Sequence, residues 1–199
     1  MPAERLADAV RRLIRLAVAT DAPAEVLEEA VAELEAVAER LEAQPRRGAK
    51  EPVLPDLKDL QATFSADPVI GVRNPIAPPV EAWVEGHDVH GRVTFGRPYE
   101  GPPGYVHGAV IAAVFDLMCG LANLAAGNAG MTGTLTIKYL RPTPLDTEIH
   151  VECRQIGAEG RKTFIGGRFL DGSKVTAEVE AVFVSLMDTR AAEYFQRKV

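Results

Sequence analysis

The chain has 199 residues, of which 47% are hydrophobic, enough to bury one substantial core and to carry an appendage. Its net charge of −6 and its pI near 5.3 exclude the basic footprint of a nucleic-acid-binding protein. The charge imbalance is local, because residues 1–44 hold 5 Lys and Arg against 10 Asp and Glu. We therefore expect an acidic N-terminal segment and no nucleic-acid partner.

Two helices are the first elements we expect, within residues 3–43 and joined at Thr20-Asp21-Ala22-Pro23. Apolar residues recur every three or four positions in each, which predicts one apolar stripe per helix, and Glu residues fill the other face of the second helix. Two helices bury little apolar surface alone. This N-terminal helical hairpin, residues 1–44, therefore either folds on itself or the rest of the chain, or is an oligomerisation or partner-docking arm.

Residues 45–66 form a predicted linker, because spaced prolines forbid regular helix or central strand over most of it. Within this linker Leu57, Leu60 and Phe64 favour a short helix laid on the surface.

Strand patterns begin after residue 80. Residues 81–85 and 91–96 alternate around His87-Asp88 and predict a hairpin. After a long apolar segment come four more candidate strands, at 132–141, 147–156, 161–170 and 175–186. Two strands, one helix and four mostly hairpin-linked strands predict an α+β domain, an antiparallel sheet wrapped around one long helix. We place this domain at residues 67–188, followed by a C-terminal tail at 189–199.

The long apolar segment is the helix at the centre of this prediction. From Ala109 to Ala126 nearly every residue is apolar or small, Asp116 is the one ionisable side chain, and Gly127 ends the run. A helix that is apolar on all sides is either a membrane span or the centre of a soluble domain. A span would hold Asp116 at mid-membrane, at a cost of roughly 2.5–3.5 kcal/mol and without supporting flanks. We therefore expect no membrane span but a buried helix whose carboxylate caps a loop, meets an Arg or is functional.

Cysteine usage and the N-terminus bear on the compartment. Cys119 and Cys153 lie far apart without metal-ligand spacing, so we expect two buried reduced thiols and neither a metal nor a cofactor. The N-terminus is charged and lacks the apolar region of a signal peptide. Both features favour a cytoplasmic protein.

Three motifs in order carry a resemblance to a known family. Val106-His107-Gly108-Ala109, with Asp116 nine residues after the His, resembles the His-Gly-Gly…Asp motif of hotdog acyl-CoA thioesterases. Met131-Thr132 and the later Arg141-Pro142-Thr143-Pro144-Leu145 resemble the strand and turn that follow the helix in that family, and Gly160-Arg161-Lys162 also recurs. The similarity covers about residues 70–186 and is closest to the phenylacetate-pathway (PaaI-like) and thioesterase-superfamily branch. One departure is Ala109, where the motif has a second Gly.

The resemblance implies a hotdog-fold hydrolase that cleaves acyl-CoA to a carboxylic acid and CoA. It puts the oxyanion contact on the Gly108 N–H at the helix N-terminus, where free amides and the helix dipole favour negative charge. It makes Asp116 the residue that activates water or attacks directly. It places Thr132 of the opposite subunit at this site, in a homodimer or a dimer of dimers. It also implies that His107 shapes the loop, and it leaves substrate contacts to Ala109 and, for the coenzyme A phosphates, to Arg141, Arg161 and Lys162.

Two other functions remain open. Ala109 and the acidic arm leave room for a non-catalytic acyl-CoA-binding or scaffold protein. A hotdog hydratase or dehydratase is disfavoured, because no suitable second His accompanies Asp116.

Overall fold

The computed structural model describes residues 1–45, 56–78 and 80–185. The predicted N-terminal helices are α1 (Pro2–Ala19) and α2 (Ala24–Glu42), and the predicted short helix is α3 (Leu60–Thr63). The remaining elements are β1 (Glu81–Glu85), β2 (Asp88–Thr94), the 3-10 turn η1 (Arg97–Tyr99), α4 (Gly108–Ala125), β3 (Gly130–Tyr139), β4 (Glu148–Glu159), β5 (Lys162–Asp171) and β6 (Lys174–Ser185). All six expected strands and the long helix are present.

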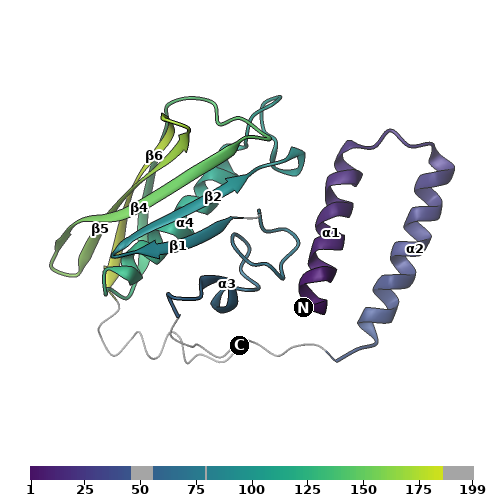
Figure 1. Cartoon of the computed structure of the whole chain (residues 1–199), viewed down its shortest axis with the longest axis horizontal. Coiled ribbons are helices and arrows are strands. Elements are labelled where there is room, and N and C mark those ends of the chain that lie inside the picture. The colour runs from purple at the N-terminus through teal and green to yellow at the C-terminus, as the bar shows by residue number, and fades with distance from the viewer. Residues whose placement is uncertain (46–55, 79, 186–199) are drawn as a thin grey trace.

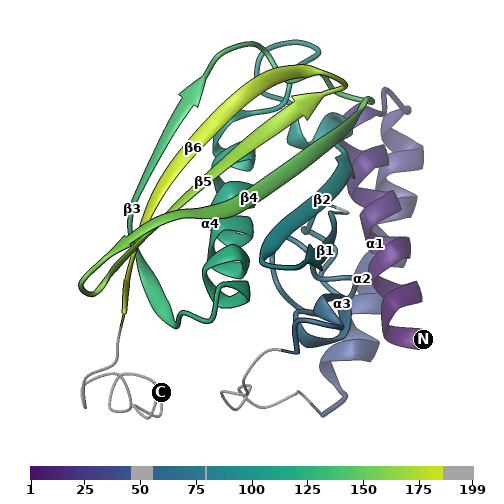
Figure 2. The same cartoon turned by 60° about the vertical axis from the view of Figure 1, so that its left-hand side comes forward.

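The six strands form one antiparallel sheet in the order β1-β2-β4-β5-β6-β3, so β1 and β3 are its two edges. The sheet curves around α4, which lies against one of its faces (Figures 1 and 2). A single helix wrapped by an antiparallel sheet is the predicted hotdog architecture. The turns β4–β5 and β5–β6 contain Gly160 and Gly172 at positive φ, 56° and 55°, a conformation that glycine adopts without steric cost.

Burial of α4 differs from the prediction. Phe115 and Met118 are fully buried against the sheet, and the Phe115 ring meets Phe169 edge-on with centroids 4.6 Å apart. The side of α4 that carries Ala109, Ala113 and Asp116 is exposed. The prediction of a buried helix therefore holds for one side of α4 in the single chain, because the sheet covers that side and no described element covers the other. By length and composition α4 could cross a membrane, but its buried side packs as a core helix does.

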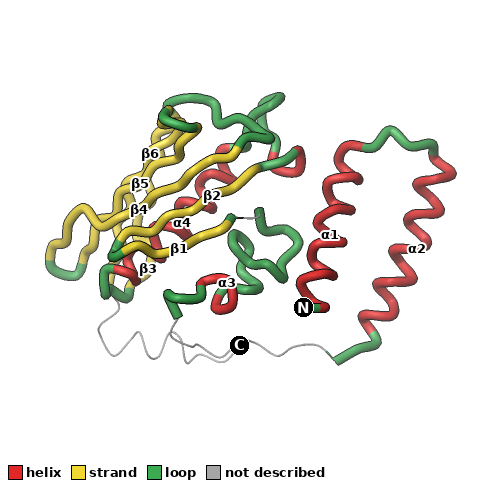
Figure 3. The backbone as a smooth tube through the Cα atoms, viewed as in Figure 1, coloured by secondary structure: helices red, strands yellow, loops and turns green. Residues whose placement is uncertain are grey.

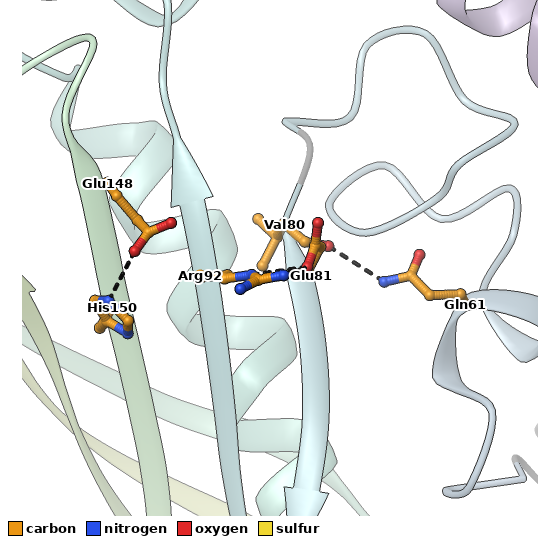
Figure 4. Close-up of polar contacts among 6 residues, drawn as sticks. All are labelled: Gln61, Val80, Glu81, Arg92, Glu148 and His150. Carbon is orange, nitrogen blue, oxygen red and sulfur yellow. Dashed lines mark hydrogen bonds and ion pairs between the residues drawn. The ribbon is translucent and has the colours of Figure 1, made fainter.

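The β1 edge is held by polar contacts and by the segment before it. Arg92 on β2 donates from Nε to Glu81 on β1 at 2.8 Å, and Gln61 of α3 donates to the Val80 carbonyl at 3.4 Å (Figure 4). Leu60 is 3% exposed and joins the main core. The short helix was therefore predicted correctly, although Leu60 lies inside the core and not on the surface.

The two N-terminal helices, which we call the arm (residues 1–45), attach to the domain through α1 (Figure 3). Ala7 is buried, and Arg11 donates to the Asn74 carbonyl at 3.0 Å. No residue of α2 is buried. Residues 46–55 of the predicted linker and the whole predicted tail, 189–199, lie outside the described residues.

Candidate active site

The N-terminus of α4 is positioned by two neighbouring loops. The Val106 N–H donates to the Thr143 carbonyl in the turn after β3, and the His107 N–H donates to the Tyr99 carbonyl of η1, both at 2.9 Å. A Cβ on Gly101 would lie 2.8 Å from the His107 Cα, so this close approach of backbones requires glycine. The Pro-containing turn and η1 therefore fix where α4 begins.

Within the described part of the chain, the hydrogen bonds at the start of α4 leave one amide without an acceptor. His107 is the N-cap, and its Nδ1 accepts from the Ala109 N–H at 3.0 Å. The His107 carbonyl accepts from Val110 and Ile111. Among the described residues, no acceptor is recorded for the Gly108 N–H. This amide points from a helix N-terminus, where the dipole favours an anion.

Tyr139 contacts Gly108 and was not predicted from the sequence. Its hydroxyl donates to the Gly108 carbonyl at 2.8 Å, and a Cβ on Gly108 would lie 3.3 Å from the Tyr139 ring. The alternation of Leu135, Ile137 and Tyr139 along β3 was the available signal, since it puts all three on the face toward α4.

The carboxylate of Asp116 is held by a hydroxyl. Thr132 on β3 donates from Oγ1 to Asp116 Oδ1 at 2.9 Å, and both side chains are exposed. A β-bulge at Gly133 interrupts the pairing of β3 with β6 between Thr132 and Thr134. Bulges re-aim side chains, and this one turns Thr132 toward α4.

This contact corrects the expectation for Thr132. The resemblance implied that Thr132 reaches Asp116 from the opposite subunit, but the structure joins Thr132 and Asp116 of the same chain. The physical reason is that β3 runs back along α4, so the Thr132 hydroxyl beside the bulge lies within hydrogen-bond distance of the carboxylate.

Gly108 and Asp116 of one chain lie too far apart to act on one thioester. Eight residues separate them, and at 1.5 Å per residue the helix puts them about 12 Å apart along its axis. A reacting water must lie about 3–3.5 Å from the carbonyl carbon whose oxygen the amide holds. A single chain therefore does not bring the two groups that the resemblance implies to one thioester.

The basic residues expected at the coenzyme A phosphates lie at two ends of the sheet. The Arg141 N–H donates to the Thr176 carbonyl at the start of β6, while Lys162 pairs with Val184 near its end. Eight strand residues separate these positions, about 26 Å. Arg161 lies beside Lys162, and Arg141 lies at the Gly108 end of β3. The three residues therefore do not form one phosphate site in a single chain.

Both cysteines are free and buried, as predicted, with their sulfurs 3.8 Å apart. The hydrogen bond from Cys119 and burial raise the pKa of the Cys153 thiol well above its usual value, so Cys153 does not suit a nucleophile. Within the described part of the chain, no group of three or more His, Cys, Asp or Glu residues is arranged to hold a metal ion.

Comparison with known proteins decides the family. The sequence profile of the thioesterase superfamily matches residues 103–178. A thioesterase superfamily protein of known crystal structure is 36% identical to the chain, with a TM-score of 0.82 over 92% of this chain and 90% of that protein. The chain belongs to the thioesterase superfamily. Because this relative aligns over nearly the whole chain, the similarity extends into the arm.

Other relatives of this thioesterase superfamily chain match a part of it. Acyl-coenzyme A thioesterase THEM4 of Xenopus laevis is 36% identical over 92 residues, 45% of this chain and 41% of that protein, and the Mus musculus protein is 34% identical over 93 residues. The chain spans about two fifths of the length of these curated relatives. Zebra fish thioesterase superfamily member 2, 16% identical with a TM-score of 0.56, covers 67% of the chain and shares the fold.

Proposed function

We propose that this protein hydrolyses the thioester of acyl-CoA, releasing a carboxylic acid and free CoA. The observation that carries the proposal is the Asp116 carboxylate held by Thr132 on the exposed side of α4. The first amide of this helix, the Gly108 N–H, has no acceptor among the described residues. Hydrolysis needs a donor for the oxyanion and a base for water, and these groups supply one of each. Ala109 in place of the motif's second Gly does not weaken the proposal, because the Ala109 N–H already donates to His107 Nδ1.

The site is completed by a second copy of the chain. Because about 12 Å separates Gly108 from Asp116 along one helix, the amide of one copy acts with the carboxylate of the other. Two antiparallel α4 helices related by a two-fold axis near Ala112 bring residue 108 of one level with residue 116 of the other. Small residues on the exposed side, Ala109 and Ala113, allow that close approach.

The edge strand β3 supports the same pairing. One side of β3 pairs with β6, and the other has no partner strand in the described sheet. An unpaired edge is a template for another strand. Pairing of β3 with β3 of a second copy continues the sheet and sets the two α4 helices side by side, which gives a homodimer with two sites.

This dimer also brings the separated basic residues together. Arg141 lies at the Gly108 end of β3, and Arg161 and Lys162 lie at the Thr132 end. In a site built from Gly108 of one copy and Thr132 of the other, Arg141 of the first and Arg161 and Lys162 of the second lie on the same side. They are the proposed contacts for the phosphates of CoA.

The two buried reduced thiols support a cytoplasmic location, and the His-Gly…Asp motif supports the phenylacetate-pathway branch.

Release of free thiol from a panel of short, long and aromatic acyl-CoAs tests the proposal. We expect turnover by the wild-type protein and by Asp88→Asn, a control that makes the same chemical change at the start of β2. We expect little turnover by Asp116→Asn. Binding of acyl-CoA without thiol release from any substrate would overturn hydrolysis and favour the non-catalytic acyl-CoA-binding function.

A further inference from the structure

The arm exposes a set of large apolar side chains that no described residue covers. Ten of them are 37–53% exposed: Leu6, Leu13, Leu16 and Val18 on α1, and Val26, Leu27, Val31, Leu34, Val37 and Leu41 on α2. Exposed apolar surface of this extent marks an interaction site more often than a free surface. Within the described part of the chain, α1 and α2 do not bury these side chains against each other.

The spacing of the exposed side chains is that of helix-on-helix packing. On α2, Leu27, Val31, Leu34, Ala38 and Leu41 follow a spacing of four and three residues in turn. Leu at the d position and Val or Ala at a is the pattern of a coiled-coil seam. On α1, Leu6, Ala9, Leu13 and Leu16 repeat the same spacing. Both seams are therefore shaped to receive another helix.

Charges beside the two seams are complementary. Exposed Arg5 and Arg12 flank the seam of α1, whereas Glu28, Glu35 and Glu42 flank the seam of α2. An α2 seam facing another α2 seam would bring like charges together, but an α1 seam facing an α2 seam pairs opposite charges. The acidic flanks of α2 also oppose docking on an anionic lipid surface.

We propose that the arm binds the arm of a second copy, with α1 of each copy packed on α2 of the other in a four-helix bundle. The helices are 18 and 19 residues long, enough for the 20–30 residues a side and about 800 Å² per partner of a standard interface. The arm lies beside the β1 and β2 end of the sheet, away from β3 (Figure 2). This interface is therefore separate from the β3 and α4 surface, and it links molecules whether or not they hydrolyse acyl-CoA.

The mass of the full-length protein in solution, measured by light scattering during gel filtration, tests this interface. We expect Leu34→Glu with Leu41→Glu to halve the wild-type mass, because two charges enter the seam. Ala32→Glu with Ala36→Glu adds the same charge on the opposite side of α2 and should leave the mass unchanged. Both pairs are exposed, so neither should unfold the domain. Equal mass for the wild type and the seam variant would overturn the proposal, whether the seam is bare, binds another class of protein or is covered by the chain's own residues.

Charge reversal tests which helices meet. Arg5→Glu with Arg12→Glu, and separately Glu28→Arg with Glu35→Arg, should each lower the mass at 50 mM salt, because each opposes like charges across the interface. The four changes combined in one chain should restore the wild-type mass. Failure of the combined variant to restore it would overturn the pairing of α1 with α2.

Discussion

Two surfaces of this chain are left uncovered by its described residues, and they differ in what they expose. The surface of α4 and β3 shows small side chains on α4 and polar groups fixed by hydrogen bonds, as Thr132 fixes Asp116 at 2.9 Å, and β3 also exposes Met131 and Tyr139. The arm shows large aliphatic side chains, among them Leu34 and Leu41, with charges only at the margins.

The α4 and β3 surface is suited to catalysis, whereas the arm is suited to association. Small residues and preorganised polar groups stabilise a developing charge without reorganisation. Leu and Val at seam positions stabilise association by burial, which has no directional requirement. We therefore expect changes on the α4 surface to alter rate constants and changes on the arm to alter molecular mass.

The largest effect should come from Asp116. Asp116→Asn keeps the shape of the side chain but removes the base, so kcat should fall by at least about 10²-fold with KM little changed. Steady-state thiol release measures this. Since the side chain is exposed, thermal unfolding should be nearly unchanged. Turnover like that of wild type would remove Asp116 from the mechanism.

The next largest effect should come from loss of the Gly108 N–H. Gly108→Pro deletes the N–H at a first helical position that tolerates proline, and His107 already has the extended ψ of 134° that precedes proline. Loss of an oxyanion donor costs about 10²–10³ in kcat. Gly108→Ala keeps the amide and adds a Cβ 3.3 Å from Tyr139, so it should cost far less. Equal losses for Pro and Ala would point to crowding at Tyr139 and not to the amide.

The sequence predicted the sheet and the long helix, but not which side of α4 is exposed or which groups bind Asp116 and Gly108. Alternation along strands and glycine turns such as Gly160 carry the fold locally. The bulge at Gly133 breaks that alternation, so Thr132 and Leu135, three residues apart, both face α4. Periodicity assigns residues at odd spacing to opposite faces, and it therefore cannot place Thr132 on the same face as Tyr139. Likewise, an apolar composition cannot show that one side of α4 is exposed in the single chain.

Mixed oligomers test whether Gly108 and Asp116 of one site come from different chains, and whether Thr132 and Asp116 come from the same chain. Gly108→Pro and Asp116→Asn, refolded together in equal amounts, should recover to about a quarter of wild-type activity, because half of the dimers are mixed and each has one intact site. Asp116→Asn with Thr132→Ala should not recover, because both residues serve the same site from one chain. Native mass spectrometry confirms mixing. Recovery in the second mixture and not in the first would restore the opposite-subunit role for Thr132.

The smallest effect on turnover should come from removing the arm. Deletion of residues 1–44 should leave kcat within about three-fold of wild type, because the arm supplies no group to Asp116 or Gly108. A structural route from the arm to the site runs through η1, where α1 packs and where the Tyr99 carbonyl holds the His107 N–H at 2.9 Å. Loss of the buried Ala7 and of the Arg11 contact should lower the unfolding temperature. Thiol release and thermal unfolding, measured on the same preparation, separate the two effects. If a deletion variant that stays folded loses turnover by more than about 10²-fold, the size of a lost catalytic group, then η1 transmits the position of α1 to the cap of α4, and the arm belongs to the reaction surface as well.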